Sequence, residues 1–406
     1  MMISDPELHE LEKYAVDQIT HVCNEIGPRM PGSQEETRGH DYMKQELAKF
    51  VDEVQSESFN VHPKAFMGVF PLVAILTLVS IAFFWFIPWV GLILASVALL
   101  SIVLEFLLYK RFLDPFFPKK KSQNLSGIKN ASGETKRILL LGGHIDSTWE
   151  WRYNLLKSRF PLKFVILSSL AGLVLSLLAN LSAVLFRSDG DISIQNIWGI
   201  IGIILLFFVP GGIASIFFTN FNKGSPGAND NLSGVFTSIA LAKYIHEHNI
   251  SFENTEIRFL QCGAEEPGLR GSKAYAKKHR KNLRGIESMY IAMDTFRDLE
   301  FLTIYTRDMT KIVKNSKRAG KILQVAGKNL GMDLPFDGVP LGASDAAAFS
   351  QAGIDAICLA AQDPKPLDYY HTRRDTPENL RPKTMGVAMQ VILEAMKLFD
   401  AHGFDV

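Results

Sequence analysis

Five short motifs in this sequence carry histidine or acidic side chains, and each follows a strand-like apolar run or a loop beside one. The groups are two imidazoles and several carboxylates, contributed by His144, Asp146, Asp230, Glu265, Glu266, Asp294 and His371. Taken singly, each has an ordinary structural explanation, such as a helix N-cap for Asp230 or a surface position for His371. Because the carboxyl ends of strands in one α/β sheet form a shared crevice, the motifs together predict one cluster.

Two imidazoles with three carboxylates form a ligand set that suits divalent metal ions, and zinc in particular. A pair of such ions, about 3.5–4 Å apart, can activate water and polarise a carbonyl group. A further carboxylate that is not a ligand is then needed to take the proton of the water. The adjacent Glu265 and Glu266 can serve these two purposes, one on the metal and one on the water. Asp146, two residues from His144, is placed to orient that imidazole.

The elements that must position these groups alternate between strands and helices. Strands are expected at 52–61, 123–128, 137–141, 256–262, 288–293, 301–305 and 356–359. Helices are expected at 232–249, 271–282, 310–330, 346–352 and 382–401, after a helix–loop–helix segment at 6–50. This alternation predicts a three-layer α/β domain with a mostly parallel sheet.

Long apolar blocks interrupt this pattern. From Met67 to Tyr109 the only ionisable side chain is Glu105, and 164–186 and 197–218 carry no charge. A helix of about 20 apolar residues crosses a bilayer. The first block therefore predicts two spans, 69–87 and 89–108, and the other two runs predict a second pair, with a kink at Pro210. Glu105 is expected at the level of the lipid headgroups.

Each pair of spans forms a hairpin, so the rest of the chain lies on one side of the membrane. Cations gather on that side, at Lys64, Lys110, Arg111, Lys119, Lys120, Lys121, Arg152, Lys157, Arg159, Lys163 and Lys223. The turns on the other side carry only Arg187, beside Asp189 and Asp191. This bias predicts a multi-pass protein of the cell (inner) membrane, with its large domain in the cytoplasm. The three cysteines have no metal-type spacing, and the polar first residues do not resemble a secretory signal peptide. Both observations agree with a cytoplasmic domain.

The domain boundaries and the overall charge follow from the same blocks. We expect a discontinuous domain made of 1–65, 111–155 and 220–406, with membrane hairpins at 66–110 and 156–219. Lys and Arg number 43 against 42 Asp and Glu, for a net charge of +1. A nucleic-acid-binding protein would show a basic excess, so no nucleic-acid partner is expected.

The motifs, in this order, resemble those of the co-catalytic zinc aminopeptidase and glutamate carboxypeptidase family of the MH clan. The resemblance covers most of the chain outside the apolar blocks. It includes two further segments, Gly27-Pro28-Arg29 with Gly32-Ser33, and Gly342-Ala343-Ser344-Asp345 at a helix start. It implies a three-layer α/β/α zinc-exopeptidase sandwich, two zinc ions and a peptide substrate.

The resemblance also implies the metal ligands. Asp230 bridges the two metal ions. His144 and Glu266 complete one metal site, and Asp294 and His371 complete the other.

Three further residues receive roles in catalysis from the resemblance. Glu265 is the general base, and Asp146 orients a ligand histidine. Tyr370 resembles a tyrosine that stabilises the oxyanion in the carboxypeptidase branch; packing beside the site is its alternative.

The sequence departs from soluble relatives in one respect. Where these have a short loop, a long apolar insertion separates His144 from Asp230, and another separates Val61 from Gln123. A helical hairpin keeps the two ends of such a loop close together, so we expect the fold and the metal site to persist. Because the second hairpin emerges beside two ligands, the active site is expected to face the bilayer or lie near it.

The leading hypothesis is a membrane-embedded di-zinc exopeptidase, with an aminopeptidase favoured over a carboxypeptidase. One alternative keeps the fold but catalyses glutaminyl cyclisation with a single zinc. Another is a non-catalytic membrane receptor or scaffold, which the intact ligand set disfavours. A transporter is disfavoured because the spans carry almost no ionisable residues.

Overall fold

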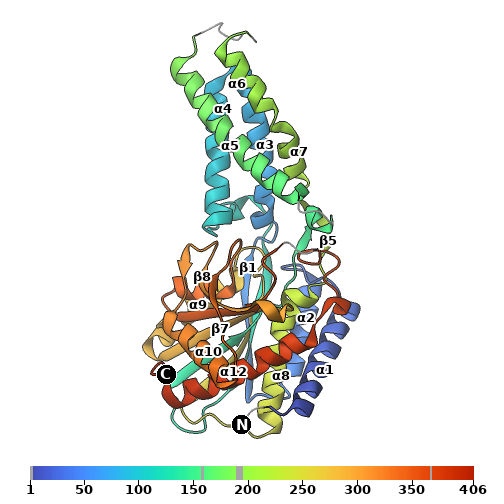
Figure 1. Ribbon diagram of the computed structural model, residues 1–406, viewed down its shortest axis with the longest axis vertical. Helices are drawn as coiled ribbons and strands as arrows, with labels where there is room; N and C mark the ends of the chain where they lie inside the picture. Colours follow the sequence, from blue (N-terminus) through green and yellow to red (C-terminus); the bar gives the residue numbers. More distant parts are fainter. Residues whose placement is uncertain (1–2, 157–159, 189–194, 366–367) are drawn as a thin grey trace. The chain divides into compact units, whose positions relative to one another are not determined.

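The computed structural model describes residues 3–156, 160–188, 195–365 and 368–406 (Figure 1). The chain forms two compact units. The first, the sheet unit, contains Met1–Pro63, Lys119–Thr148 and Gly224–Val406, and the second, the helical unit, contains Lys64–Pro118 and Trp149–Lys223. Four charges used above to orient the membrane hairpins, Lys157, Arg159, Asp189 and Asp191, lie outside the described residues.

The sheet unit is built on one mixed sheet in the order β1-β2-β6-β3-β7-β11-β8-β10, with β9 paired to β8. The strands are β1 Glu53–Val61, β2 Lys120–Lys129, β3 Arg137–Gly142, β6 Thr255–Gln261, β7 Glu287–Phe296, β8 Leu302–Asp308, β9 Val313–Lys314, β10 Phe336–Gly338 and β11 Asp355–Ala361. The central strands β6, β3, β7 and β11 run parallel to one another. The expected α/β fold with a mostly parallel mixed sheet is therefore confirmed.

The alternation of side chains along β3 explains why helices cover both faces of the sheet. Leu139 and Leu141 enter one core cluster, whereas Ile138 and Leu140 enter another on the opposite face. Strands buried on both faces read as continuous apolar runs, which made this segment easy to recognise. The first face is covered by α1 Asp5–His21, α2 Gln34–Leu47, α8 Ser233–Glu247, α10 Lys317–Asn329 and α12 Pro382–His402, and the second by α9 Arg270–Gly285 and α11 Asp345–Gln351 (Figure 1).

One predicted helix begins later than expected. The sequence predicted a helix over 310–330, but α10 starts at Lys317. Residues 309–311 instead have positive φ angles of 48°, 53° and 66°, and β9 pairs with β8 before the helix begins. Ser316 is the N-cap, and its hydroxyl accepts a hydrogen bond from the backbone of Ala319 at 3.3 Å. The capping serine, rather than the preceding periodicity, sets the start of the helix.

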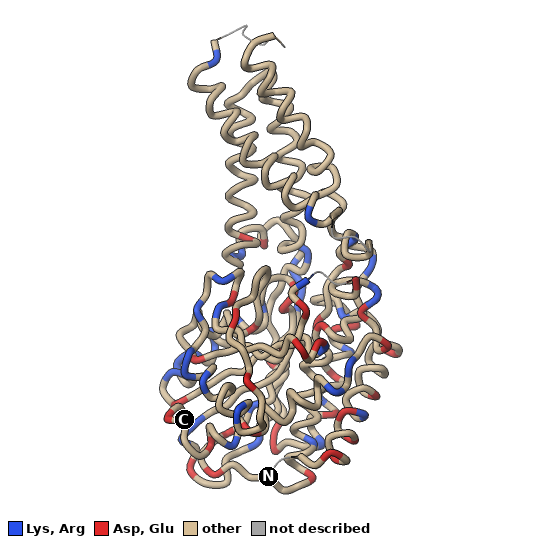
Figure 2. The backbone as a smooth tube through the Cα atoms, in the orientation of Figure 1, with Lys and Arg blue, Asp and Glu red and all other residues tan. Residues whose placement is uncertain are grey.

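The helical unit contains α3 Ala65–Phe86, α4 Pro88–Ser101, α5 Phe160–Phe186, α6 Ile197–Leu206 and α7 Val209–Ile216, with the short strands β4 Trp149–Trp151 and β5 Thr219–Gly224 at its chain junctions. Within the described residues, four helical stretches are long and apolar enough to cross a membrane: 65–86, 88–107, 160–186 and 197–216. Figure 2 shows how few charges they carry. The last stretch breaks between α6 and α7, just before Pro210, as a proline kink predicts.

Two buried polar features lie within the helical unit. Glu105 is fully buried, and its carboxylate accepts a hydrogen bond from the backbone N–H of Leu113 at 2.9 Å. Ser80, Ser176 and Asn180 form a second group, the serine–asparagine cluster, which joins α3 to α5 through hydrogen bonds.

Candidate metal centre

The carboxyl ends of the parallel strands bring the predicted ligands together. His144 follows β3, Glu265 and Glu266 lie on the turn after β6, and Asp294 lies near the end of β7. A parallel bridge between His144 and Cys262 extends the pairing of β3 with β6 to the edge of the site. Asp230, just before α8, and His371, after β11, complete the group.

Asp230 lies between the two histidines. One carboxylate oxygen, Oδ1, is 3.2 Å from Nε2 of His144, and the other, Oδ2, is 2.9 Å from Nε2 of His371. Glu266 adds an oxygen 3.5 Å from the same nitrogen of His371. Glu265 Oε2 is 3.9 Å from Nε2 of His144. A carboxylate that faces two imidazoles through separate oxygens can share two metal ions.

The side chains of this cluster form overlapping groups, each close enough to hold a metal ion. Potential ligand atoms of His144, Asp230 and Asp294 lie within 4.8 Å of one another, and so do those of Asp230, Glu266 and His371. A third group contains His144, Glu265 and Glu266, so Glu266 lies within this distance of both histidines. The pairing that the resemblance implies, His144 with Glu266 and Asp294 with His371, stays a prediction.

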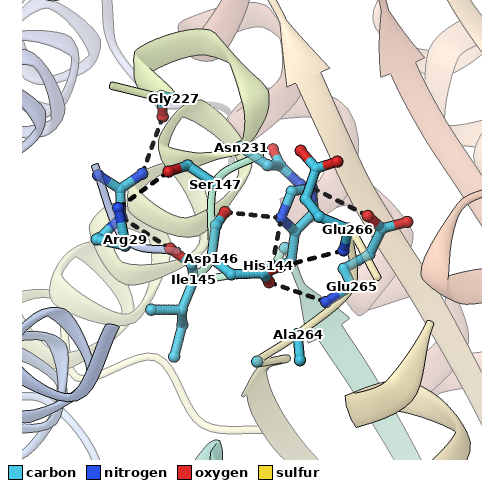
Figure 3. A network of polar contacts seen from close by, with 12 residues as sticks. Arg29, His144, Ile145, Asp146, Ser147, Gly227, Asn231, Ala264, Glu265 and Glu266 are labelled. Atoms are coloured by element: carbon cyan, nitrogen blue, oxygen red, sulfur yellow. Dashed lines mark hydrogen bonds and ion pairs between the residues drawn. The ribbon is translucent and has the colours of Figure 1, made fainter. Parts of the chain in front are cut away.

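Asp146 acts through its backbone as well as its side chain. The backbone oxygen of Asp146 is 3.1 Å from Nδ1 of His144, whereas its nearer carboxylate oxygen is 3.6 Å away. The carboxylate accepts hydrogen bonds from the backbone N–H groups of Glu265 and Glu266 at 2.9 and 3.1 Å (Figure 3). Asp146 thus contacts a ligand histidine and also fixes the turn that carries both glutamates.

A second buried carboxylate, which the sequence did not reveal, supports the same turn. Glu36 accepts hydrogen bonds from the backbone of Ala264 at 3.1 Å, from the hydroxyl of Ser122 at 2.7 Å and from the backbone of Gly32 at 2.6 Å. Burial and the neighbouring Asp146 raise the pKa of Glu36 to about 8. Its only signal in the sequence was its place in the first turn of a helix that follows Gly32-Ser33.

The loop that carries Asp230 is held by two further side chains. Asp375, in the last of the five motifs, accepts hydrogen bonds from the backbone of Asn229 at 2.9 Å and of Asp230 at 3.0 Å. The side chain of Asn231 donates to the backbone oxygen of Met293 at 2.8 Å and accepts from the backbone of Thr295 at 3.2 Å. The bonds of Asp375 join the Asp230 loop to the segment that follows His371, and those of Asn231 join it to the end of β7.

The electrostatics of the cluster favour a bound cation. Burial, together with neighbouring carboxylates, raises the pKa of Glu265 and Glu266 well above the usual range and that of Asp294 to about 7. Burial opposes the ionisation of Asp230 as well, but hydrogen bonds from the two histidines outweigh it and lower its pKa. So many carboxylates in one buried place are costly unless positive charge compensates them.

Residues 215–396 match the family model described as Peptidase family M28. This match covers a little under half of the chain. Aminopeptidase YwaD of Bacillus subtilis (strain 168) is 29% identical over 183 residues, which are 42% of this chain and 37% of that protein. The match therefore spans little more than a third of that relative's length. These findings confirm the resemblance to the co-catalytic zinc aminopeptidase family.

Solved structures agree on the fold. A zinc aminopeptidase from Bacillus subtilis superposes with a TM-score of 0.56 at 15% identity, over 96% of this chain and 95% of that one. A glutaminyl cyclase from Bacteroides thetaiotaomicron, bound to N-acetylhistamine, superposes with a TM-score of 0.54 at 15% identity, over 98% of both chains. At this identity the similarity shows that the fold is shared.

The residues of this cluster fit the zinc that the matched family implies. Nitrogen and carboxylate oxygen ligands are those that zinc prefers. Among the described residues, Oε1 of Glu266 is buried and accepts no hydrogen bond, although it lies 3.5 Å from Nε2 of His371. A buried carboxylate oxygen left without a hydrogen bond is expected at a position that a metal ion would fill.

Tyr370 lies against a ligand of this site. Its ring stacks on the ring of His371, with centroids 3.9 Å apart and planes inclined by 20°. Burial and the nearby carboxylates raise the pKa of Tyr370 well above its usual range, so the hydroxyl keeps its proton. The ring therefore supports the position of His371, and the hydroxyl is a hydrogen-bond donor.

Proposed function

We propose that the sheet unit is a two-zinc exopeptidase, and specifically an aminopeptidase, in a protein whose apolar helices form two membrane hairpins. The observation that carries this proposal is the position of Asp230, with one oxygen toward each histidine. Each histidine also has its own carboxylate neighbour, Asp294 or Glu266. A single metal ion would leave one of these two ligand sets without a purpose.

In this proposal His144 and Asp294 would hold one zinc ion, Glu266 and His371 would hold the other, and Asp230 would contribute to both sites. Zinc, when bound, lowers the pKa of water and polarises the peptide carbonyl. The side chains of the protein carry out the proton transfers and stabilise the oxyanion.

Glu265 takes the proton of the attacking water, holds it, and delivers it to the nitrogen of the departing amine. The backbone of Glu265 is fixed by Asp146, so its carboxylate does not need to be ordered during the reaction. Tyr370 donates a hydrogen bond to the oxyanion that develops on the carbonyl.

The preference for a free amino terminus follows from charge. The site gathers carboxylates from Asp230, Glu265, Glu266, Asp294 and Asp345, all of them at least largely buried. An ammonium group of the substrate would be attracted to this surplus of negative charge, and a substrate carboxylate would be repelled. The M28 relative named above is also an aminopeptidase.

The domain organisation is part of the proposal. The peptidase domain is discontinuous, and the hairpins at 66–110 and 156–219 are insertions into its loops. The described cations Lys64, Lys110, Arg111, Lys163 and Lys223 flank the ends of the spans that join the peptidase segments, whereas Arg187 follows the opposite end of α5. This distribution supports a peptidase domain on the cytoplasmic side.

The test uses the full chain, purified in detergent and loaded with zinc, on peptides with a free or a blocked terminus. We expect hydrolysis of peptides with a free amino terminus, whether or not the carboxyl terminus is blocked. Glu265→Gln keeps the shape of the side chain but removes the base, so hydrolysis should be abolished while the zinc content is unchanged. Full turnover by this variant would refute the role of Glu265.

Glutaminyl cyclisation is a second candidate, because glutaminyl cyclases share the fold. A single-zinc cyclase would hold one zinc ion per chain and release ammonia from a peptide with an amino-terminal glutamine. The proposed exopeptidase would hold two zinc ions and release the terminal residue. Elemental analysis and ammonia detection on the same preparation distinguish the two.

A further inference from the structure

Arg29 is a fully buried cation of the sheet unit, with 0% of its surface exposed. Its guanidinium donates hydrogen bonds only to backbone oxygens in the described structure: Nε to Ile145 at 2.8 Å, Nη1 to Gly27 at 3.1 Å and to Pro226 at 2.9 Å, and Nη2 to Gly227 at 3.3 Å. Figure 3 shows the guanidinium between these segments. An arginine buried among carbonyl groups calls for an explanation, because burial of its charge is expensive.

The carbonyl groups that Arg29 joins belong to two segments that carry proposed metal ligands. Ile145 directly follows His144, and Gly227 lies three residues before Asp230. The backbone of Arg29 adds two bonds to the first segment: its N–H donates to the hydroxyl of Ser147 at 2.9 Å, and its oxygen accepts from the N–H of Ser147 at 3.0 Å.

The same two segments are the ends of the second insertion. The chain leaves the sheet unit after Thr148 and returns at Gly224. At this gap the N–H of Ser225 donates to the oxygen of Thr148 at 2.9 Å. The side chain of Arg29 also joins the two ends of the gap, because it donates to the backbone oxygens of Ile145 and Pro226, which lie closer in sequence to the proposed ligands.

We propose that Arg29 is a positioning residue that fixes His144 and Asp230 relative to each other across the insertion. This inference rests on the proposed zinc site. The chain between the two ligands is long, so its covalent path alone constrains their separation weakly. The planar guanidinium offers several donors in fixed directions, and can therefore bind both segments at once. A lysine presents a single ammonium and cannot reproduce this geometry.

The test compares Arg29→Lys and Arg29→Met in the full chain with the matched control Arg137→Met. Arg137 belongs to the same unit and binds Glu287 at 2.6 Å and the backbone oxygen of Asp400 at 2.9 Å. Arg137 and Glu287 are the first residues of β3 and β7, at the opposite ends of these strands from His144 and Asp294. Zinc affinity is measured by competition with a chelator, kcat and KM are measured at saturating zinc, and thermal unfolding reports on the fold. The visible spectrum of the cobalt-substituted protein reports on the ligand geometry.

We expect Arg29→Met to weaken zinc binding by about 10- to 100-fold. Its cobalt spectrum should change, and kcat should fall more than KM rises. Arg29→Lys should lie between Arg29→Met and the wild type. Arg137→Met should lower the unfolding temperature without changing zinc affinity or the cobalt spectrum.

The inference is overturned if the Arg29 variants have the zinc affinity and the cobalt spectrum of the wild type. It is also overturned if Arg137→Met, at the same loss of stability, weakens zinc binding as much as the Arg29 variants do. Should Arg29→Met not fold, Arg29→Lys and Ser147→Ala decide the matter by the same measurements. A wild-type protein that binds no zinc would instead overturn the proposed function itself. The two failures are therefore distinguishable.

Discussion

Each unit contains a buried polar cluster, and the two clusters differ in charge. In the sheet unit, charged groups crowd around the metal centre, where Asp230 lies between two imidazoles and other carboxylates lie close by. In the helical unit, the serine–asparagine cluster is neutral. The hydroxyl oxygens of Ser80 and Ser176 are 2.7 Å apart, and the side chain of Asn180 donates to the backbone oxygen of Ser176 at 2.9 Å.

The difference separates polar groups that serve chemistry from those that serve packing. Like charges held together in a buried site oppose folding, and they are retained where a ligand compensates them. Neutral side chains that bond to each other inside apolar helices help those helices associate. Gly91 shows how closely the helices pack, because a Cβ at that position would overlap the carboxamide oxygen of Asn180. Damage to the first cluster should therefore remove activity, and damage to the second should reduce stability.

Removal of metal gives the largest expected effect. A zinc chelator should abolish hydrolysis completely, and added zinc should restore it, since the side chains alone cannot activate water. The fold should survive, because the apolar core on both faces of the sheet does not depend on the metal. Activity and circular dichroism on the same sample test this. Loss of helical signal together with activity would mean that the metal is structural.

Asp375→Asn should have the next largest effect, a loss of zinc affinity of about 10- to 100-fold. The carboxylate accepts bonds from Asn229 through Oδ1 and from Asp230 through Oδ2, and an asparagine has only one oxygen to offer. One backbone N–H near the bridging ligand would then face an amide N–H group. Chelator competition measures the change.

The matched control for this variant is Asp368→Asn, in the same loop. Asp368 is half exposed and binds Arg374 at 2.8 Å, and exposed ion pairs contribute little. Its zinc affinity should equal that of the wild type. Equal losses in the two variants would indicate that the loop as a whole, not Asp375, holds the site.

Much of the fold and the ligand set could be predicted because local patterns carry them. Strands such as β3 and β11 are apolar on both faces, and His144, Asp230 and Glu266 stand in motifs of recognisable spacing. The grouping of the ligands could not be predicted in the same way. It depends on how the loops beyond the strand ends meet, because β3 is a neighbour of both β6 and β7 and the order β6-β3-β7 is set by contacts between distant segments.

The supporting residues were missed for a related reason. Glu36 holds the backbone of Ala264 across 228 positions of the chain, and nothing near Glu36 in the sequence marks this partner. Arg29 was noticed as part of a motif, but its acceptors are backbone oxygens, which have no side-chain signature. Residues that hold a site by binding backbone groups become visible only when the fold is known.

Glu36 also gives a test that depends on pH. Its pKa of about 8 in the folded protein exceeds the ordinary value of 4.5, so the folded state binds the proton more tightly than the unfolded state. The contribution of Glu36 to stability is therefore greatest below the unfolded pKa and is lost as the pH rises toward 8, by about 1 kcal/mol per pH unit. Glu36→Gln should flatten the fall of the unfolding temperature between pH 5 and 8 in zinc-loaded protein. Parallel slopes for variant and wild type would contradict this assignment.

The smallest expected effect lies in the helical unit. Asn180→Leu should destabilise the folded protein by about 1 kcal/mol, because interhelical hydrogen bonds in membranes contribute about 0.6 kcal/mol each on average. Zinc affinity and kcat should not change. Ser96→Ala is the control, since the hydroxyl of Ser96 binds only Leu92 of its own helix, at 2.7 Å, and should contribute almost nothing.

A double-mutant cycle of Ser80→Ala with Asn180→Leu decides whether the cluster acts as a unit. The two side chains share a hydrogen bond of 3.2 Å. The double variant should therefore lose less unfolding free energy than the sum of the losses in the two single variants. If the losses are additive, the two residues stabilise the helices separately. If kcat falls with stability unchanged, the division between packing in one unit and chemistry in the other is wrong, because the polar groups of the helical unit would then contribute to the reaction.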